Sequence, residues 1–177
     1  MLRLALMLLL AGTGFAAAQP ADPDLPPPDP PGVWRKITHD DSTSDSTCIG
    51  NPVTPLCALE TYFACFQRSR NDFCDLVEAG VRFDAKRKLP ATNYREYRIL
   101  YARRPSRLDP VNRATEGPLK PLAGDVIIAV FERNCYSETL PGIPPCSIGV
   151  EDEPPNVYMM RKQGDRWTNP YHFKQRY

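Results

Sequence analysis

Six cysteines constrain the fold of this chain more than any other residues do. They are Cys48, Cys57, Cys65, Cys74, Cys135 and Cys146. An even number of cysteines in an exported chain indicates a disulfide framework, although six cysteines allow many pairings and the sequence does not choose among them. Cys135–Cys146 is the favoured pair, because prolines and a glycine between them predict a tight loop, and Cys48–Cys57 and Cys65–Cys74 are expected next. A zinc site is disfavoured, since no C-x-x-C spacing occurs and the chain has only 2 histidines.

Residues 1–18 have the pattern of a secretory signal peptide. Arg3 precedes an apolar run from Leu4 to Leu10, and small residues follow at 16–18. This order is typical of a leader that is cleaved, here before Gln19, and the apolar run is too short to span a bilayer. We therefore expect a periplasmic or secreted protein. The chain has no Asn-x-Ser/Thr acceptor, which fits a bacterial envelope.

The remaining chain divides into a tail and one domain. Residues 19–50 form a Pro/Asp-rich extended tail and a polar loop, and a plain tether is favoured over a proline motif for a partner. Within them, residues 33–37 are expected to be a short apolar hook against the domain. Residues 51–177 are long enough for a single α+β domain with its own core.

Helical signals come first in the domain. Thr54 is a good N-cap, Pro55 fits the first helical position, and apolar side chains recur at helical spacing from Leu56 to Phe66. A second short helix is expected over residues 72–79, ended by the following glycine.

Strand signals follow the helices. A Gly164-Asp165 turn predicts a hairpin between the last two strands, and Pro170 predicts that the final strand lies at an edge or carries a bulge. The segment 125–133 is almost continuously apolar, which indicates a strand buried on both faces. The expected strands are 94–103, 125–133, 156–162 and 166–173.

The order of these signals resembles the nuclear transport factor 2-like (SnoaL-like) superfamily over residues 51–177. The resemblance rests on an amphipathic helix ending at Arg70-Asn71-Asp72, a short second helix, a strand from Asp125 and the Gly164-Asp165-Arg166-Trp167 hairpin. It implies an α+β fold in which N-terminal helices pack on a curved, cone-like antiparallel sheet, here stapled by disulfides, often with an apolar cavity at its mouth. The chain departs from the family in its 105–121 and 135–146 loops and in lacking a recognisable sixth strand.

The resemblance also implies candidate catalytic residues. Members of the superfamily often hold an Asp–His pair, or a tyrosine and an aspartate, inside the cone for proton transfer. Here the candidates are His172 with Asp125, and Tyr97 or Tyr158 as a proton donor. The simpler interpretation is a surface histidine and an ordinary turn aspartate. No hydrolase, phosphate-binding or metal-binding motif occurs, so no cofactor or metal is expected.

Charge is distributed unevenly along the chain. The whole chain has 22 basic and 21 acidic residues, one base being in the leader, so a nucleic-acid partner is disfavoured. Yet residues 82–120 contain eleven bases and four acids, while residues 19–50 contain six acids and two bases. An anionic partner could dock on the basic segment, or the acidic tail could fold back and neutralise it. The candidate docking residues are Arg87, Lys88, Arg95, Arg98, Arg103 and Arg104.

Three functions are compatible with these features. The favoured one is an exported binding or interaction module of the bacterial envelope, for an unknown protein or a small apolar ligand. The alternatives are a small enzyme with a cavity Asp–His pair and an accessory subunit of an envelope complex. A homodimer through the open face of the sheet is a further expectation.

Overall fold

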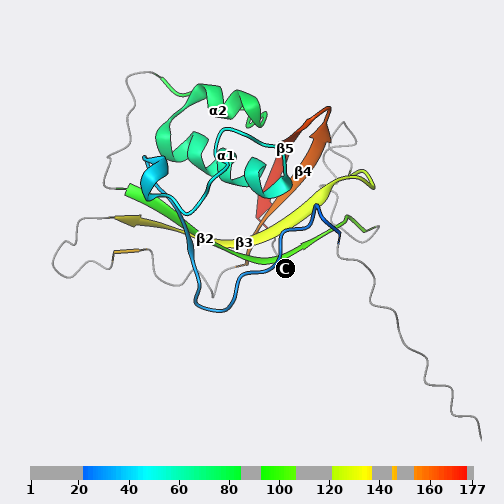
Figure 1. The fold of residues 1–177 in the computed structure, drawn as a ribbon, viewed down its shortest axis with the longest axis horizontal. Coiled ribbons are helices and arrows are strands. Elements are labelled where there is room, and N and C mark those ends of the chain that lie inside the picture. The colour runs from blue at the N-terminus through cyan, green and yellow to red at the C-terminus, as the bar shows by residue number, and fades with distance from the viewer. Residues whose placement is uncertain (1–21, 85–92, 107–120, 137–144, 147–153, 175–177) are drawn as a thin grey trace, which may run out of the picture.

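Two helices pack against a curled antiparallel sheet in a half-barrel arrangement (Figure 1). The structure is a computed structural model that describes residues 22–84, 93–106, 121–136, 145–146 and 154–174, without the side chains of residues 170–174. In chain order, its elements are β1 (Arg35–Ile37), the 3-10 turn η1 (Asp41–Thr43), α1 (Pro55–Arg68), α2 (Asn71–Leu76), β2 (Asn93–Arg103), β3 (Val126–Tyr136), β4 (Asn156–Gln163) and β5 (Arg166–Lys174). The fold is therefore α+β.

The sheet is a simple meander. Its five strands lie in the order β1-β2-β3-β4-β5, and each pairs antiparallel with its neighbour. The register shifts between Ile99 and Tyr101 and again between Met159 and Arg161. Such irregularities increase local twist and bend, which accounts for the curl of the sheet around α1.

The first strand corrects the expected element order. Helices were expected to come first, but β1 precedes them and pairs with β2, with Ile37 opposite Arg95. Ile37 is fully buried in the main core. The apolar hook is thus an integral strand, and the folded domain begins before residue 51. Three residues are too few to show a strand period, which explains the wrong prediction.

Helix α1 begins where the sequence predicts. The Thr54 hydroxyl accepts the Cys57 N–H at 3.1 Å, and Pro55 occupies the first turn. The helix is buried on nearly every side because the sheet covers one face while α2 and residues 38–53 lie against the others. It ends at Ser69, which adopts the left-handed conformation with φ of 50°.

The core occupies both sides of the sheet. The larger cluster joins α1 to the inner face, with Phe63, Tyr97, Tyr158 and Trp167 among its buried side chains. A smaller cluster of Ile127, Ala129 and Val157 lies on the opposite face. All residues from Val126 to Val130 are buried, so the prediction of a strand covered on both faces is confirmed.

Three disulfides join the pairs that the spacing favoured. They are Cys48–Cys57, Cys65–Cys74 and Cys135–Cys146, with Cα–Cα distances of 5.4, 5.1 and 4.0 Å. The first ties the preceding loop to α1, and the second ties α1 to α2. Each closes a loop of about ten residues, for which chain entropy predicts about 2–3 kcal/mol of stabilisation. Such a set is typical of an oxidising extracellular or periplasmic environment.

The described helices are all too short or too polar to cross a membrane. The proposed leader lies outside the described residues.

Residues 22–34, which we name the N-terminal strap, lie against the sheet. Asp29 donates its N–H to the carbonyl of Ile99 at 2.9 Å, and its carboxylate accepts the Ile99 N–H at 2.8 Å. The same carboxylate pairs with Arg35 at 2.8 Å. The described part of the tail is therefore a bound segment and not a free tether.

Candidate functional site

Asp125, the expected partner of His172, is bound to an arginine. It is 1% exposed, and its two carboxylate oxygens accept from Arg161 at 2.9 and 2.7 Å. One of them also accepts the Leu122 N–H at 2.8 Å. The strand register sets His172 opposite Tyr158, while its side chain lies outside the described part. The described contacts of Asp125 thus give it a structural role at the start of β3.

The two candidate tyrosines are buried and bind two different carboxylates. The Tyr97 hydroxyl donates to Glu60 Oε1 at 2.5 Å, and the Tyr158 hydroxyl donates to Glu132 Oε1. Burial, reinforced by the neighbouring carboxylate, raises the pKa of both phenols well above the ordinary value. Both therefore stay neutral hydrogen-bond donors.

Two of the arginines expected to form an anionic docking surface are paired with carboxylates of the strap or of Glu132. Arg104 pairs with Asp22 at 2.8 Å and with Asp24 at 2.9 Å. Arg95 pairs with Glu132. For Arg104, the alternative in which the acidic tail folds back on the basic segment is the one observed.

The other candidate docking residues are packed or undescribed. Arg98 is 9% exposed and its guanidinium lies 5.7 Å from the Trp34 ring centroid and 5.5 Å from that of Phe131. Arg103 lies 5.8 Å from the Tyr101 ring centroid. Arg87 and Lys88 fall outside the described residues. Among the described candidates, aromatic rings thus lie beside Arg98 and Arg103, and carboxylates pair with Arg95 and Arg104.

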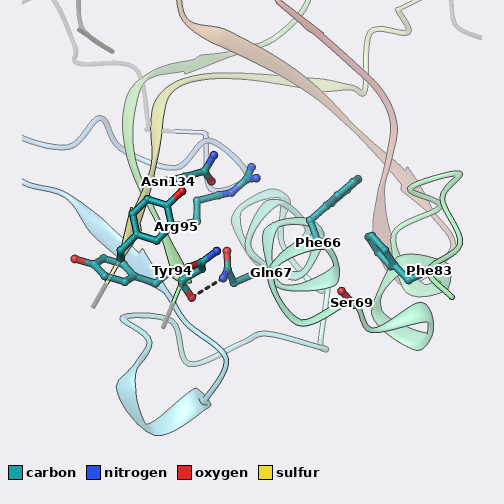
Figure 2. A pocket seen from close by; sticks show the side chains of 9 residues that line it. Phe66, Gln67, Ser69, Phe83, Tyr94, Arg95 and Asn134 are labelled. Atoms are coloured by element: carbon teal, nitrogen blue, oxygen red, sulfur yellow. Dashed lines mark hydrogen bonds between the residues drawn. The ribbon is translucent and has the colours of Figure 1, made fainter. Parts of the chain in front are cut away.

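A cavity of about 420 Å³ opens at the C-terminal end of α1 (Figure 2). Its aromatic lining includes Phe66 and Phe83 on one side and Tyr94 on the other, and Tyr136 also lines it. The rings of Phe66 and Phe83 meet edge to face, with centroids 5.7 Å apart. Tyr136 is 47% exposed at the rim. Rigid aromatic walls of this kind suit a flat apolar guest.

Polar side chains from three elements complete the cavity. Gln67 lies between the walls and donates to the Asn93 carbonyl at 2.6 Å. Asn134 and Arg95 come from β3 and β2, and Ser69 from the end of α1. Buried in the protein, Ser69 Oγ and Arg95 Nε have no hydrogen-bond partner. Because most buried polar atoms are paired, these two mark an incompletely satisfied site.

A chain of polar contacts runs from the cavity into the core. Arg95 contacts Glu132, which accepts from Tyr158, and the Arg95 guanidinium lies 5.1 Å from the Phe63 ring centroid. Burial raises the pKa of Tyr62 beside this chain to about 12, an effect that Arg95 opposes and Glu132 adds to. Glu132 and the Phe63 ring therefore hold the Arg95 side chain in place, and its positive charge faces the cavity.

No metal centre emerges from the described side chains. Glu96, Cys135 and Cys146 bring three potential ligand atoms within 4.8 Å of one another. Both sulfurs, however, are joined in a disulfide, and a disulfide sulfur is not the thiolate that metals require. Glu96 is instead paired with Arg133 at 2.6 Å.

Sequence reasoning missed several of the residues that matter here. Glu60 and Gln67 sit on the apolar stripe of α1 that runs through Leu59 and Phe63. Polar residues at apolar positions of a helix are the available signal for a buried network. Ser69 and Glu132 carry no such signal, because their roles depend on backbone conformation and on cross-strand partners.

Comparisons of the chain with protein-family models, curated proteins and solved structures gave no match. By its fold and site, the chain is a disulfide-bonded α+β protein with a half-barrel sheet and a mixed aromatic and polar cavity beside α1. The relationship to the nuclear transport factor 2-like superfamily stays a prediction.

Proposed function

We propose that the protein is an exported binding module of the bacterial envelope that holds a small, flat, largely apolar ligand in the cavity beside α1. The observation that carries the proposal is the pair of unpartnered buried atoms, Ser69 Oγ and Arg95 Nε, on residues that line an aromatic-walled cavity. A ligand in such a site covers the apolar walls and pairs with the unpartnered polar atoms.

The lining restricts the chemistry of the ligand. Phe66, Phe83 and Tyr94 offer ring faces and edges to a planar body. Arg95 offers a positive charge and the unpartnered Nε–H, which favour a carbonyl or carboxylate at one edge of that body. The volume of about 420 Å³ suits a molecule of metabolite or small-drug size.

Binding is favoured over the alternative functions. Both carboxylate oxygens of Asp125 accept from Arg161, which supports a structural role for this residue. The strap lies on its own domain through Asp29 and Arg104, so it is already engaged within its own chain. The three disulfides agree with a role outside the cytoplasm.

Native mass spectrometry of protein purified from the envelope fraction of its own host tests the proposal. We expect a retained small-molecule adduct, and the same spectrum reports leader cleavage and any homodimer. Tyr94→Ala removes a wall and is expected to lose the adduct. Tyr101→Ala is the matched control, since Tyr101 is also a half-buried tyrosine of β2 but packs on the smaller core cluster. A bare mass for the wild type, or an adduct kept by Tyr94→Ala, would contradict the proposal.

A further inference from the structure

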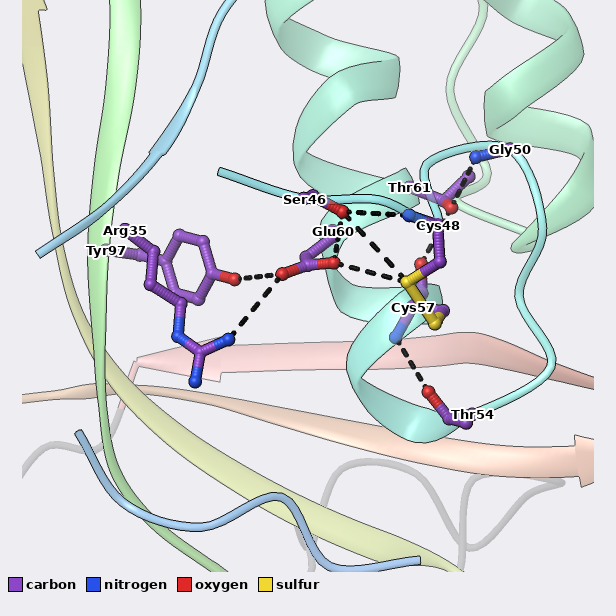
Figure 3. The surroundings of a disulfide bond; sticks show 9 residues. All are labelled: Arg35, Ser46, Cys48, Gly50, Thr54, Cys57, Glu60, Thr61 and Tyr97. Atoms are coloured by element: carbon purple, nitrogen blue, oxygen red, sulfur yellow. Dashed lines mark hydrogen bonds and ion pairs between the residues drawn. A yellow bond between two sulfur atoms is a disulfide. The ribbon is translucent and has the colours of Figure 1, made fainter. Parts of the chain in front are cut away.

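A buried carboxyl group faces one of the three disulfides. Glu60 is 3% exposed, and its Oε2 lies 3.4 Å from Cys48 Sγ in the Cys48–Cys57 bond (Figure 3). This is the closest approach of a carboxylate to a disulfide sulfur among the contacts described above. It lies toward the N-terminal end of α1, away from the cavity at the other end.

Four groups set the charge state of Glu60. Tyr97 donates to Oε1 at 2.5 Å, Ser46 donates to Oε2, and Arg35 Nη1 lies 4.0 Å from Oε1. Burial raises the pKa of Glu60, the two donors and Arg35 oppose that shift, and Asp29 on the strap adds to it.

The redox state of the disulfide changes the surroundings of this carboxyl. In the oxidised protein Cys48 Sγ carries no proton, so sulfur lone pairs face the carboxylate oxygen. In the reduced protein the Cys48 S–H lies within reach of Oε2 and donates to it. An ionised Glu60 therefore favours the dithiol over the disulfide.

The two sulfurs differ in the way that exchange chemistry requires. Cys48 is half-buried and Cys57 is 7% exposed, so an attacking thiolate reaches Cys48 first. Cys57 lies in the first turn of α1, where the helix N-terminus stabilises a thiolate leaving group. The Cys65–Cys74 bond has sulfur-bearing residues that are 0% and 1% exposed, which closes it to attack.

We propose that Cys48–Cys57 is a thiol–disulfide exchange site for a dithiol reductant, and that Glu60 positions the Cys48 thiol and couples the exchange to protons. One thiolate of the dithiol attacks Cys48 Sγ, the S–S bond breaks, and its electron pair leaves on Cys57. The second thiolate of the dithiol then attacks the dithiol's first sulfur, which is bonded to Cys48 in the mixed disulfide, and Cys48 leaves as a thiolate. The dithiol becomes a cyclic disulfide, and both cysteines end as thiols after taking up the two protons that it gave up.

Equilibration with dithiothreitol, followed by alkylation and peptide mass mapping, tests the site. As the ratio of reduced to oxidised dithiothreitol is raised, we expect Cys48–Cys57 to open first, Cys135–Cys146 next and Cys65–Cys74 last. The reduced fraction of Cys48–Cys57 should rise as pH increases from the ordinary carboxyl pKa through the raised pKa of Glu60.

Glu60→Gln isolates the carboxyl. We expect the equilibrium constant for reduction above the Glu60 pKa to fall about tenfold in this variant, as for loss of one hydrogen bond to a charged group. The rise with pH should flatten as well. The matched control is Glu96→Gln, since Glu96 lies 3.8 Å from Cys146 Sγ but is paired with Arg133, and it should leave Cys48–Cys57 unchanged.

Tyr97→Phe provides a second test that keeps the carboxyl. It removes a donor to Glu60, so the pKa of Glu60 rises further and the pH at which reduction becomes favoured moves upward. The proposal is overturned if Cys48–Cys57 opens no earlier than Cys135–Cys146, or if both Glu60→Gln and Tyr97→Phe leave its pH dependence unchanged. The exchange site is independent of the cavity, so an adduct in native mass spectrometry bears on neither outcome.

Discussion

The two ends of helix α1 are built in opposite ways. At the N-terminal end, Thr54 caps the helix and the Glu60 carboxylate accepts from Tyr97 and Ser46. At the C-terminal end, Ser69 has a left-handed backbone and an unpartnered buried hydroxyl beside an open cavity. The polar side chains at the N-terminal end of α1 are thus hydrogen-bonded, whereas the Ser69 hydroxyl at the C-terminal end is not. The incomplete end is where a ligand has something to add.

Both ends carry a disulfide of the same span. Cys48–Cys57 and Cys65–Cys74 each join residues 9 apart, so loop entropy predicts equal stabilisation from each. The difference between the ends therefore comes from local packing and polar pairing, and point substitutions can measure it.

The largest expected difference is in packing. Leu59 is 0% exposed near the closed end, and Leu59→Ala should lower the free energy of unfolding by about 3 kcal/mol through lost burial and a cavity. Phe66→Ala, at the half-buried wall of the open end, should lose roughly half as much despite the larger side chain. Urea denaturation of the oxidised proteins measures both. Equal losses would show that the open end is packed as tightly as the closed one.

A smaller effect is expected at the N-cap. Thr54→Ala removes the side-chain acceptor for the Cys57 N–H and should destabilise the protein by about 1 kcal/mol. Thr54→Ser keeps the hydroxyl and serves as the control. A neutral Thr54→Ala would mean that Pro55 and the disulfide already fix this end of the helix.

At the C-cap the sign should reverse. Ser69→Gly relieves the left-handed backbone at φ of 50° and should raise stability by about 0.5–1 kcal/mol. Ser69→Ala removes the same hydroxyl but keeps the backbone penalty, so it should gain little. Thermal melts that rank the two variants equally would contradict the strain argument.

The smallest expected effect is the pH dependence at the closed end. The pKa of Glu60 is raised in the folded protein, so the folded state binds more protons than the unfolded state between the ordinary carboxyl pKa and the raised one. The Glu60 contribution to stability is present below the ordinary pKa and is lost as pH rises through the raised pKa. Melting curves of Glu60→Gln over this window should lack that loss, and parallel pH profiles would contradict it.

Local signals explain how much of the fold the sequence predicts. Thr54 and Pro55 set the start of α1, Gly164 sets the β4–β5 hairpin, and short spacings indicate the disulfide pairs. Strand β1 and the strap depend instead on contacts with β2, far along the chain, so their own residues contain no sufficient signal.

The cavity escapes sequence reasoning for a related reason. Its walls come from the end of α1, from Phe83 and from facing ends of β2 and β3. The pairing of β2 with β3 and the contact of Gln67 with Asn93 bring these segments together. The Asp125–His172 pair stays a prediction, because the described contacts of Asp125 are with Arg161 on the neighbouring strand and the His172 side chain lies outside the described part.

The strap also bears on how this protein resists aggregation. An exposed strand edge is a template for adding another chain. On one side of the sheet, β1 pairs with β2 as far as Tyr97. Beyond it, Asp29 hydrogen-bonds to both the N–H and the carbonyl of Ile99. On the other side, β5 contains Pro170, which has no N–H to offer. Each side of the sheet thus has fewer backbone groups available to template the growth of another chain.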